Sequence, residues 1–218
     1  ADSGRIVETK LRGVAEQTPG LVPVAKGNGY GFGLPRLAAE SQALGCDVIA
    51  VGLPSEVAAV REHFDGDIVV LTPWRPDDHH ASEIARDPRV IVTVSRLGDL
   101  EPLANIGGHP RILLEVLTSM RRHGIRSEDL AVADALGDSL RFEGWVIHLP
   151  HVTEGRLEEA TELARLCSRA RTARSGPATA GSGARRRRRT RRPAPGGTRF
   201  YKRAGPARLC TASTILRH

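Results

Sequence analysis

The amino-acid sequence predicts an α/β fold built on a parallel sheet, and three observations lead to that prediction. Short apolar, β-branched runs recur along the chain, helical patterns lie between them, and the runs begin at a nearly constant pitch. Their starts, at about residues 21, 48, 68, 90, 112 and 145, are 27, 20, 22, 22 and 33 residues apart, which is typical of repeated strand–helix units. Because a parallel sheet is covered on both faces, the fold is either a doubly wound open sheet or a (β/α)8 barrel.

Each predicted element has a local reason. The apolar runs predict buried strands over residues 21–25, 48–51, 68–71, 90–94, 112–116 and 145–149. Helical patterns cover residues 34–44, 55–63, 96–105, 127–136 and 154–170. Ser55 with Glu56, and Ser127 with Glu128 and Asp129, supply N-caps and acidic first turns. About six units are visible, whereas a barrel of eight takes about 250 residues, so we expect an incomplete (β/α)8 barrel.

The charge is divided unevenly along the 218 residues. The net charge of +7 combines an acidic part, residues 1–165 with 17 Lys/Arg and 25 Asp/Glu, and a basic part, residues 166–218 with 15 Lys/Arg and no acid. Residues 168–198 contain only Ser, Arg, Ala, Thr, Gly and Pro, which cannot form a core. We therefore expect two regions, a partial barrel domain over 1–167 and a low-complexity, disordered Arg-rich tail over 168–218.

Two origins of this tail stay open. Its residue types are those that GC-rich codons supply, so we favour an out-of-frame reading after an insertion or deletion near codon 167, which would make the chain a fragment. The alternative is a genuine basic tail that binds nucleic acid through phosphates.

The remaining composition excludes several classes of protein. The three cysteines lack the spacing of a zinc site or a disulfide framework, and this favours a reducing, cytoplasmic setting. Apolar runs of the roughly 20 residues that span a membrane are absent from the sequence. The Asp77–His80 segment lacks the spacing of a chelating pair, so we expect a loop there and no metal site.

The strongest chemical signal is the segment 23–33, in which a strand leads into Lys26 and then a loop with glycine at every second position. Its spacing fits neither the dinucleotide fingerprint nor a P-loop, in which the lysine follows the glycines. A lysine at the carboxyl end of a barrel strand points into the mouth where active sites form. Desolvated there, its amine would be a Schiff-base nucleophile. The alternative is a surface lysine beside a flexible turn.

Three segments together resemble the alanine racemase family. Residues 23–33 are similar to its cofactor-attachment motif, residues 117–125 to its Asp-Thr-Gly-Met-Asn-Arg-Leu-Gly-Ile segment, and residues 143–148 to its Glu-Gly-x-x-x-His strand. The three are co-linear and the resemblance covers about residues 1–165. It implies a barrel that binds pyridoxal 5'-phosphate.

The resemblance also implies a role for each matching residue. Lys26 takes the position that binds the cofactor covalently, Tyr30 contacts its phosphate and His148 lies against its ring. Arg122 lies near the cofactor's phenolic oxygen and the substrate carboxylate. Met120 corresponds to the family methionine and is assigned to the substrate side of the site.

The departures from the family pattern indicate a divergent branch. Many members carry, seven residues before the arginine, a lysine that becomes a carbamate, and this position is Glu115 here. We expect Glu115 to supply the same negative charge and to hold Arg122 by a charge-assisted hydrogen bond. Phe32 replaces a histidine, and Leu117 and Ser119 replace Asp and Gly.

Other family parts are missing from the sequence. Strands seven and eight, which carry the phosphate-binding loops and an arginine for the pyridine nitrogen, have no counterpart. The C-terminal β-domain, whose tyrosine serves as second base for the partner subunit, has none either. A homodimer is expected only of a full-length parent.

The resemblance implies a pyridoxal-phosphate-dependent amino-acid racemase, of which this chain would be an incomplete part whose own activity stays open. Two alternatives stay open. One is a cofactor carrier of the same barrel type without turnover. The other, less favoured, is nucleic-acid binding by the tail.

Overall fold

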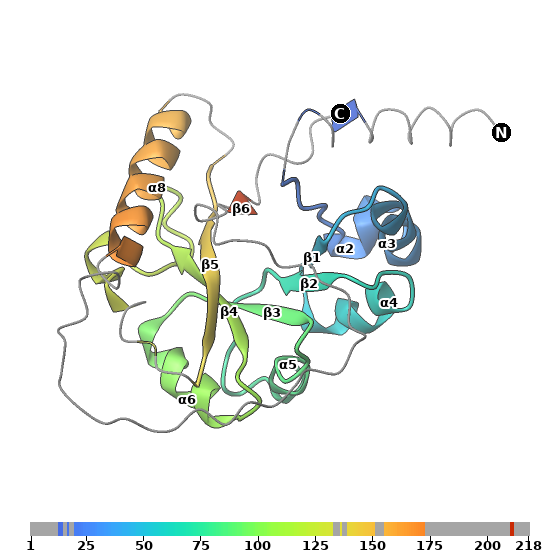
Figure 1. The fold of residues 1–218 in the computed structure, drawn as a ribbon, viewed down its shortest axis with the longest axis horizontal. Helices are drawn as coiled ribbons and strands as arrows, with labels where there is room; N and C mark the ends of the chain where they lie inside the picture. Colours follow the sequence, from blue (N-terminus) through green and yellow to red (C-terminus); the bar gives the residue numbers. More distant parts are fainter. Residues whose placement is uncertain are drawn as a thin grey trace, which may run out of the picture.

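The computed structural model describes residues 13–14, 17, 20–132, 136, 139–150, 155–172 and 210–211. Five strands run parallel and pair in chain order, as the repeated pitch predicts (Figure 1). They are β1 Val48–Val51, β2 Asp67–Val70, β3 Val90–Val94, β4 Arg111–Val116 and β5 Arg141–Ile147.

The first predicted strand, 21–25, is only partly formed. It lies along β1 through a single parallel bridge between Val24 and Ala50. Two backbone hydrogen bonds, from Ala25 N to Ala50 O and from Ala50 N to Pro23 O, each measure 2.8 Å. Pro23 has no N–H to donate, so a longer ladder is unfavourable there.

The helices follow the strands and lie around the sheet (Figure 1). They are α2 Lys26–Tyr30, α3 Leu34–Ala43, α4 Val57–Arg61, α5 His79–Ile84, α6 Leu100–Asn105 and α8 Arg156–Thr172, with 3₁₀ turns at Pro54–Glu56, Leu97–Asp99 and Ser127–Asp129. Of the predicted helix over 127–136, the structure describes the 3₁₀ turn and residues 130–132 and 136, and the remainder lies outside the described residues.

The loop predicted at Asp77–His80 is wrong in its second half. Helix α5 begins at His79, because the carboxylate of Asp78 accepts a 2.8 Å hydrogen bond from Ala81 N and so caps the first turn. The capped turn buries Ala81 against the core.

Side chains of alternate strand residues face opposite sides of the sheet. One set packs against the helices and forms the main core, with Trp145, Ile68, Ile112 and Leu114 among its largest members. The other set forms a smaller apolar cluster to which six successive parallel segments contribute one buried residue each: Val24, Ala50, Val69, Ile91, Leu113 and Val146. We call this cluster the inner apolar layer.

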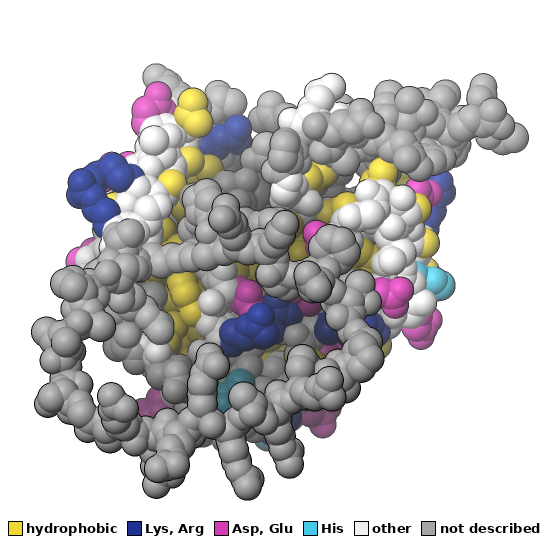
Figure 2. All heavy atoms as spheres, in the orientation of Figure 1, with side chains coloured by type: hydrophobic (Ala, Val, Ile, Leu, Met, Phe, Trp, Pro, Cys, Tyr) yellow, Lys and Arg dark blue, Asp and Glu magenta, His cyan; other side chains and the backbone are white. Residues whose placement is uncertain are grey.

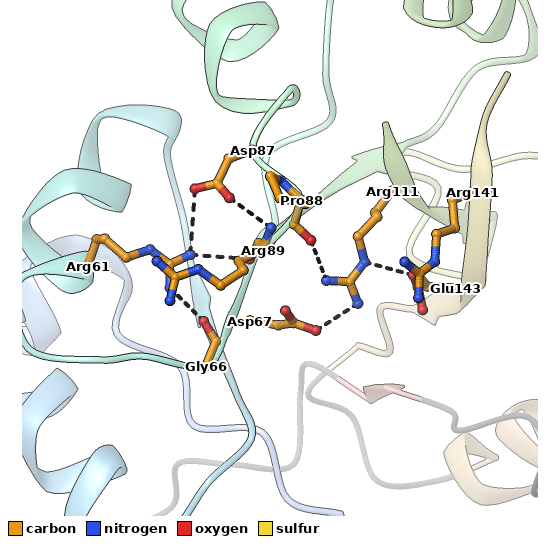
Figure 3. Close-up of polar contacts among 9 residues, drawn as sticks. All are labelled: Arg61, Gly66, Asp67, Asp87, Pro88, Arg89, Arg111, Arg141 and Glu143. Carbon is orange, nitrogen blue, oxygen red and sulfur yellow. Dashed lines mark hydrogen bonds and ion pairs between the residues drawn. The ribbon is translucent and has the colours of Figure 1, made fainter. Parts of the chain in front are cut away.

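Arg111 lies on β4 two residues before Leu113 of the inner apolar layer, towards the amino ends of the strands. It forms hydrogen bonds to three other segments (Figure 3). Its guanidinium donates to Asp67 and Glu143 at 2.7 Å each and to the carbonyl of Pro88 at 2.9 Å. Burial alone lowers the pKa of Arg111, but the hydrogen bonds to Asp67 and Glu143 outweigh it, so the pKa is raised. Arg111 is thus a charge with a hydrogen bond at each of its three side-chain nitrogens, and it ties β2 and β5 to β4.

Two described segments lie beyond the expected domain boundary at residue 167. Helix α8 continues to Thr172, and the pair Cys210–Thr211, strand β6, lies parallel to β5 opposite Val146 and Ile147. The rest of the predicted tail lies outside the described residues.

Helix α8 covers the sheet with its apolar side and carries charge on the other. It buries Leu163 and Cys167 in the main core. On the face seen in Figure 2, basic and acidic side chains lie beside each other on this helix, and Glu162 pairs with Arg165. In the part of the chain that the structure describes, every helix is too short or too polar to cross a membrane.

Replacing Arg111 by Met should lower the free energy of unfolding by about 3 kcal/mol, because the partly buried carboxylates of Asp67 and Glu143 lose the buried guanidinium that they share. Arg141→Met is the matched control, since Arg141 pairs with the same Glu143 at 2.9 Å but its side chain is 61% exposed. It should cost less than about 1 kcal/mol. Urea unfolding measures both, and equal losses would contradict the role assigned to Arg111.

Candidate functional site

A cavity of about 90 Å³ opens at the carboxyl ends of the strands. Five of its lining residues stand two positions beyond a member of the inner apolar layer, so the period of two that builds the layer also builds the site. These five are Lys26, Gly52, Leu71, Glu115 and His148, and Thr72, Arg122, His123 and Val146 complete the lining.

The cavity brings together four of the six residues singled out from the sequence: Lys26, Glu115, Arg122 and His148. Met120 is 37% exposed and is not part of the lining, so its assignment to the substrate side gains no support here. Tyr30 ends helix α2, and its side chain lies outside the described part of the structure.

Lys26 is held at the start of an unusual turn. Gly27, Asn28 and Gly29 have φ of 62°, 52° and 62°, a left-handed conformation that favours glycine. A Cβ on Gly29 would also lie 2.6 Å from a methyl carbon of Leu37. The glycines therefore let the chain turn sharply after Lys26, which is half-buried and lines the cavity rather than lying on an open surface.

The loop after β4, residues 117–124, carries Arg122 and is held from two elements. Thr118 Oγ1 donates to the carbonyl of His148 at 2.7 Å. Glu159, on helix α8, accepts from Ser119 N at 2.6 Å and from Ser119 Oγ at 2.7 Å. The serine that departs from the family glycine thus provides a second hydrogen bond to α8.

Glu115 is 5% exposed, and its Oε2 has no hydrogen-bond partner among the residues that the structure describes. Burial raises the pKa of Glu115 to about 7, although the positive charges of Arg122 and Arg75 oppose the shift. The expected hydrogen bond to Arg122 is not formed among the described residues. Arg122 lies exposed on its loop, so it interacts with Glu115 only at longer range.

Two titratable residues near the cavity, His123 and Arg75, were not among the site residues expected from the sequence. His123 lines it, and burial lowers the pKa of His123, assisted by Arg122 and Arg75. Arg75 is fixed by Asp99 at 2.8 Å and by the carbonyl of Trp74 at 2.9 Å. A usable signal existed for Arg75, because it follows a predicted strand end by only a few residues.

The pKa of Glu115 predicts how stability changes with pH. The folded carboxyl holds its proton up to about pH 7, whereas the unfolded one loses it near its ordinary 4.5. The associated stability is therefore complete below about pH 4.5 and is lost as the pH rises through 7. Glu115→Gln avoids this loss, so its free energy of unfolding relative to wild type should rise by about 2 kcal/mol from pH 5 to pH 8.

Chemical denaturation at the two pH values measures this difference. Glu101→Gln, at an exposed position on α6, is the control and should show little pH dependence relative to wild type. A Glu115→Gln difference that is the same at pH 5 and pH 8 would show that the carboxyl is not buried as described.

Comparison with known proteins agrees with this architecture. The chain is 29% identical over 152 residues to alanine racemase of Campylobacter jejuni, an alignment that covers 67% of this chain and 43% of that protein. The crystal structure of alanine racemase from Corynebacterium glutamicum superposes with a TM-score of 0.66 at 18% identity, covering 76% of this chain and 49% of that one.

Another similar structure is alanine racemase from Bartonella henselae with covalently bound pyridoxal phosphate, with a TM-score of 0.63 and 17% identity over 78% of this chain and 52% of that one. The chain thus spans about half the length of these proteins or less. The family model of the alanine racemase N-terminal domain matches residues 8–185, beyond the 165 residues of the resemblance noted in the sequence. The chain therefore belongs to the alanine racemase family.

Proposed function

We propose that this chain binds pyridoxal phosphate through Lys26 and that the protein to which it belongs racemises an amino acid. The observation that carries the proposal is the meeting of Lys26, Arg122 and His148 in one cavity at the carboxyl ends of parallel strands. Such strand ends are where barrel enzymes place their active sites. The family of the chain agrees with this assignment.

The side chains of Lys26, Arg122 and His148 suit one side of the cofactor. Lys26 offers an amine, Arg122 a guanidinium and His148 an imidazole, and all three line a cavity that Val146 of the inner apolar layer also lines. At about 90 Å³ the cavity is smaller than the several hundred Å³ typical of ligand sites. The described residues therefore supply one wall, and the resemblance assigns the phosphate-binding groups to later strands.

Each of these residues has a definable task. Pyridoxal phosphate, when bound, supplies the electron sink for the carbanion formed at the α-carbon. The Lys26 nitrogen would bind the cofactor and would be released as a free amine when the substrate's amino group takes its place. The freed amine could then accept or donate the α-proton from one face. Arg122 would orient the substrate carboxylate. The opposite face needs a second proton donor, and the resemblance implies a tyrosine from a partner subunit.

Glu115 would tune this site through its charge. Its pKa of about 7 means that the carboxyl is partly ionised at neutral pH. A guanidinium brought against Oε2 would favour the ionised form. We therefore expect Arg122 to approach Glu115 when the cavity is filled, which would supply the hydrogen bond that Oε2 lacks.

The lysine content makes the attachment test sharp, because the sequence contains only Lys10, Lys26 and Lys202. The full chain is incubated with pyridoxal phosphate, reduced with borohydride and digested, and the pyridoxyl group is located by mass spectrometry. We expect the label on Lys26. Lys26→Ala should remove it together with the visible absorbance of the complex, while Lys10→Arg and Lys202→Arg should leave both unchanged.

Equal labelling of the three lysines, or a Lys26→Ala variant that keeps the absorbance, would contradict the assignment. Racemisation is tested separately on the longer parent protein by exchange of the α-hydrogen of L-alanine and L-serine in D₂O. Attachment at Lys26 without exchange for either amino acid would favour the carrier function instead.

A further inference from the structure

We infer that Glu56 is a positioning residue for Lys26, acting through the backbone on both sides of the cavity edge. This inference rests on the proposed function, because it concerns the lysine assigned to bind the cofactor. Glu56 closes the 3₁₀ turn Pro54–Glu56 that follows β1. It lies 29 positions from Gly27, the residue directly after Lys26.

The carboxylate of Glu56 accepts three backbone hydrogen bonds. Oε1 accepts from Gly27 N at 2.9 Å, and Oε2 accepts from Gly52 N at 2.7 Å and Leu53 N at 2.9 Å. One oxygen thus holds the lysine loop and the other holds the end of β1. Hydrogen bonds from N–H groups to an ionised carboxylate are stronger than those to a neutral acceptor.

Gly52 completes the arrangement by its lack of a side chain. A Cβ on Gly52 would lie 2.9 Å from Lys26 Cβ and 3.1 Å from Glu56 Oε2. The side chain of Lys26 therefore passes directly over Gly52, and both residues line the cavity. On the preceding side, Ala25 N donates to Ala50 O at 2.8 Å. Hydrogen bonds therefore hold the residues on both sides of Lys26, and Gly52 lies under its side chain.

Only a carboxylate serves both sides of this contact. In Glu56→Gln, one of the two oxygens becomes an NH₂ group that cannot accept a hydrogen bond. Either Gly27 or the pair Gly52 and Leu53 would then face a donor. This contact differs from the helix cap and acidic first turn expected of Ser55 and Glu56. A cap binds backbone N–H groups of its own helix, whereas Glu56 also binds Gly27 N in a distant loop.

The first test compares Glu56→Gln with Glu62→Gln, an exposed glutamate at the end of the adjacent helix α4. Backbone amide exchange is measured on the full chain without cofactor, and the rate of pyridoxyl labelling at Lys26 is measured across pH with pyridoxal phosphate and borohydride. Glu56→Gln should accelerate exchange at Gly27 and slow Lys26 labelling about tenfold, with an altered pH profile. Glu62→Gln should match wild type in both.

A second pair of variants tests the position of Lys26 while the Glu56 carboxylate is kept. Gly52→Ala places a methyl group against Lys26 and should also slow labelling, whereas Gly98→Ala, with open space at its Cβ, should not. This pair keeps the inference testable if Glu56→Gln does not fold, which circular dichroism reports.

The outcomes separate the inference from the proposed function. Wild-type exchange at Gly27 in a folded Glu56→Gln variant, or wild-type labelling in both Glu56→Gln and Gly52→Ala, overturns the positioning role. Absence of labelling at Lys26 in the wild-type chain overturns the proposed function instead. In that case, accelerated exchange at Gly27 in Glu56→Gln alone still supports the role of Glu56 in holding the lysine loop.

Discussion

The alternation of side chains along parallel strands is the constraint on which the site depends. Neighbouring strands pair in fixed register, so residues two positions apart on each strand form successive layers inside the sheet. The inner apolar layer is one of these. It separates the ion pairs of Arg111 with Asp67 and Glu143, at the amino ends of the strands, from the cavity at the carboxyl ends. Leu71 and Val146 of the cavity lining are apolar, and burial desolvates the Glu115 carboxyl. The layer therefore determines both where Lys26 and Glu115 lie and how their surroundings affect their chemistry.

The polar side chains on the two sides of the inner apolar layer differ in how many hydrogen bonds they form. Arg111 donates to two carboxylates and a carbonyl at the amino ends, and this bonding outweighs the cost of its burial. Glu115, four residues further along the same strand, has one carboxyl oxygen without a hydrogen-bond partner in the described part of the chain. A buried polar atom left unpaired lowers stability and is characteristic of functional positions. One strand thus carries a hydrogen-bonded structural charge at one end and, at the other, a buried carboxyl with one oxygen unpaired among the described residues.

Much of this arrangement follows from sequence patterns, and the rest depends on geometry that they do not encode. The pitch of apolar runs predicted the five strands in order, and the position of Lys26 at a strand end predicted its place in the cavity. Pro23 shortened the first strand by removing a donor, and the cap at Asp78 created a short helix that lacks a clear apolar period. The contact from Glu56 to the lysine loop could not be predicted, because it joins two loops whose approach is set by the folded sheet. The bond expected between Glu115 and Arg122 depends in the same way on the path of a loop.

The most direct measurement of the central claim is a crystal structure of the full chain after borohydride fixation of pyridoxal phosphate. We expect a pyridoxyl group on Nζ of Lys26, with its ring above the inner apolar layer and beside His148, and with Glu115 on the same side of the sheet. A pyridoxyl group outside the cavity, or a Glu115 side chain that faces the helices, would contradict the layered arrangement from which the function is inferred.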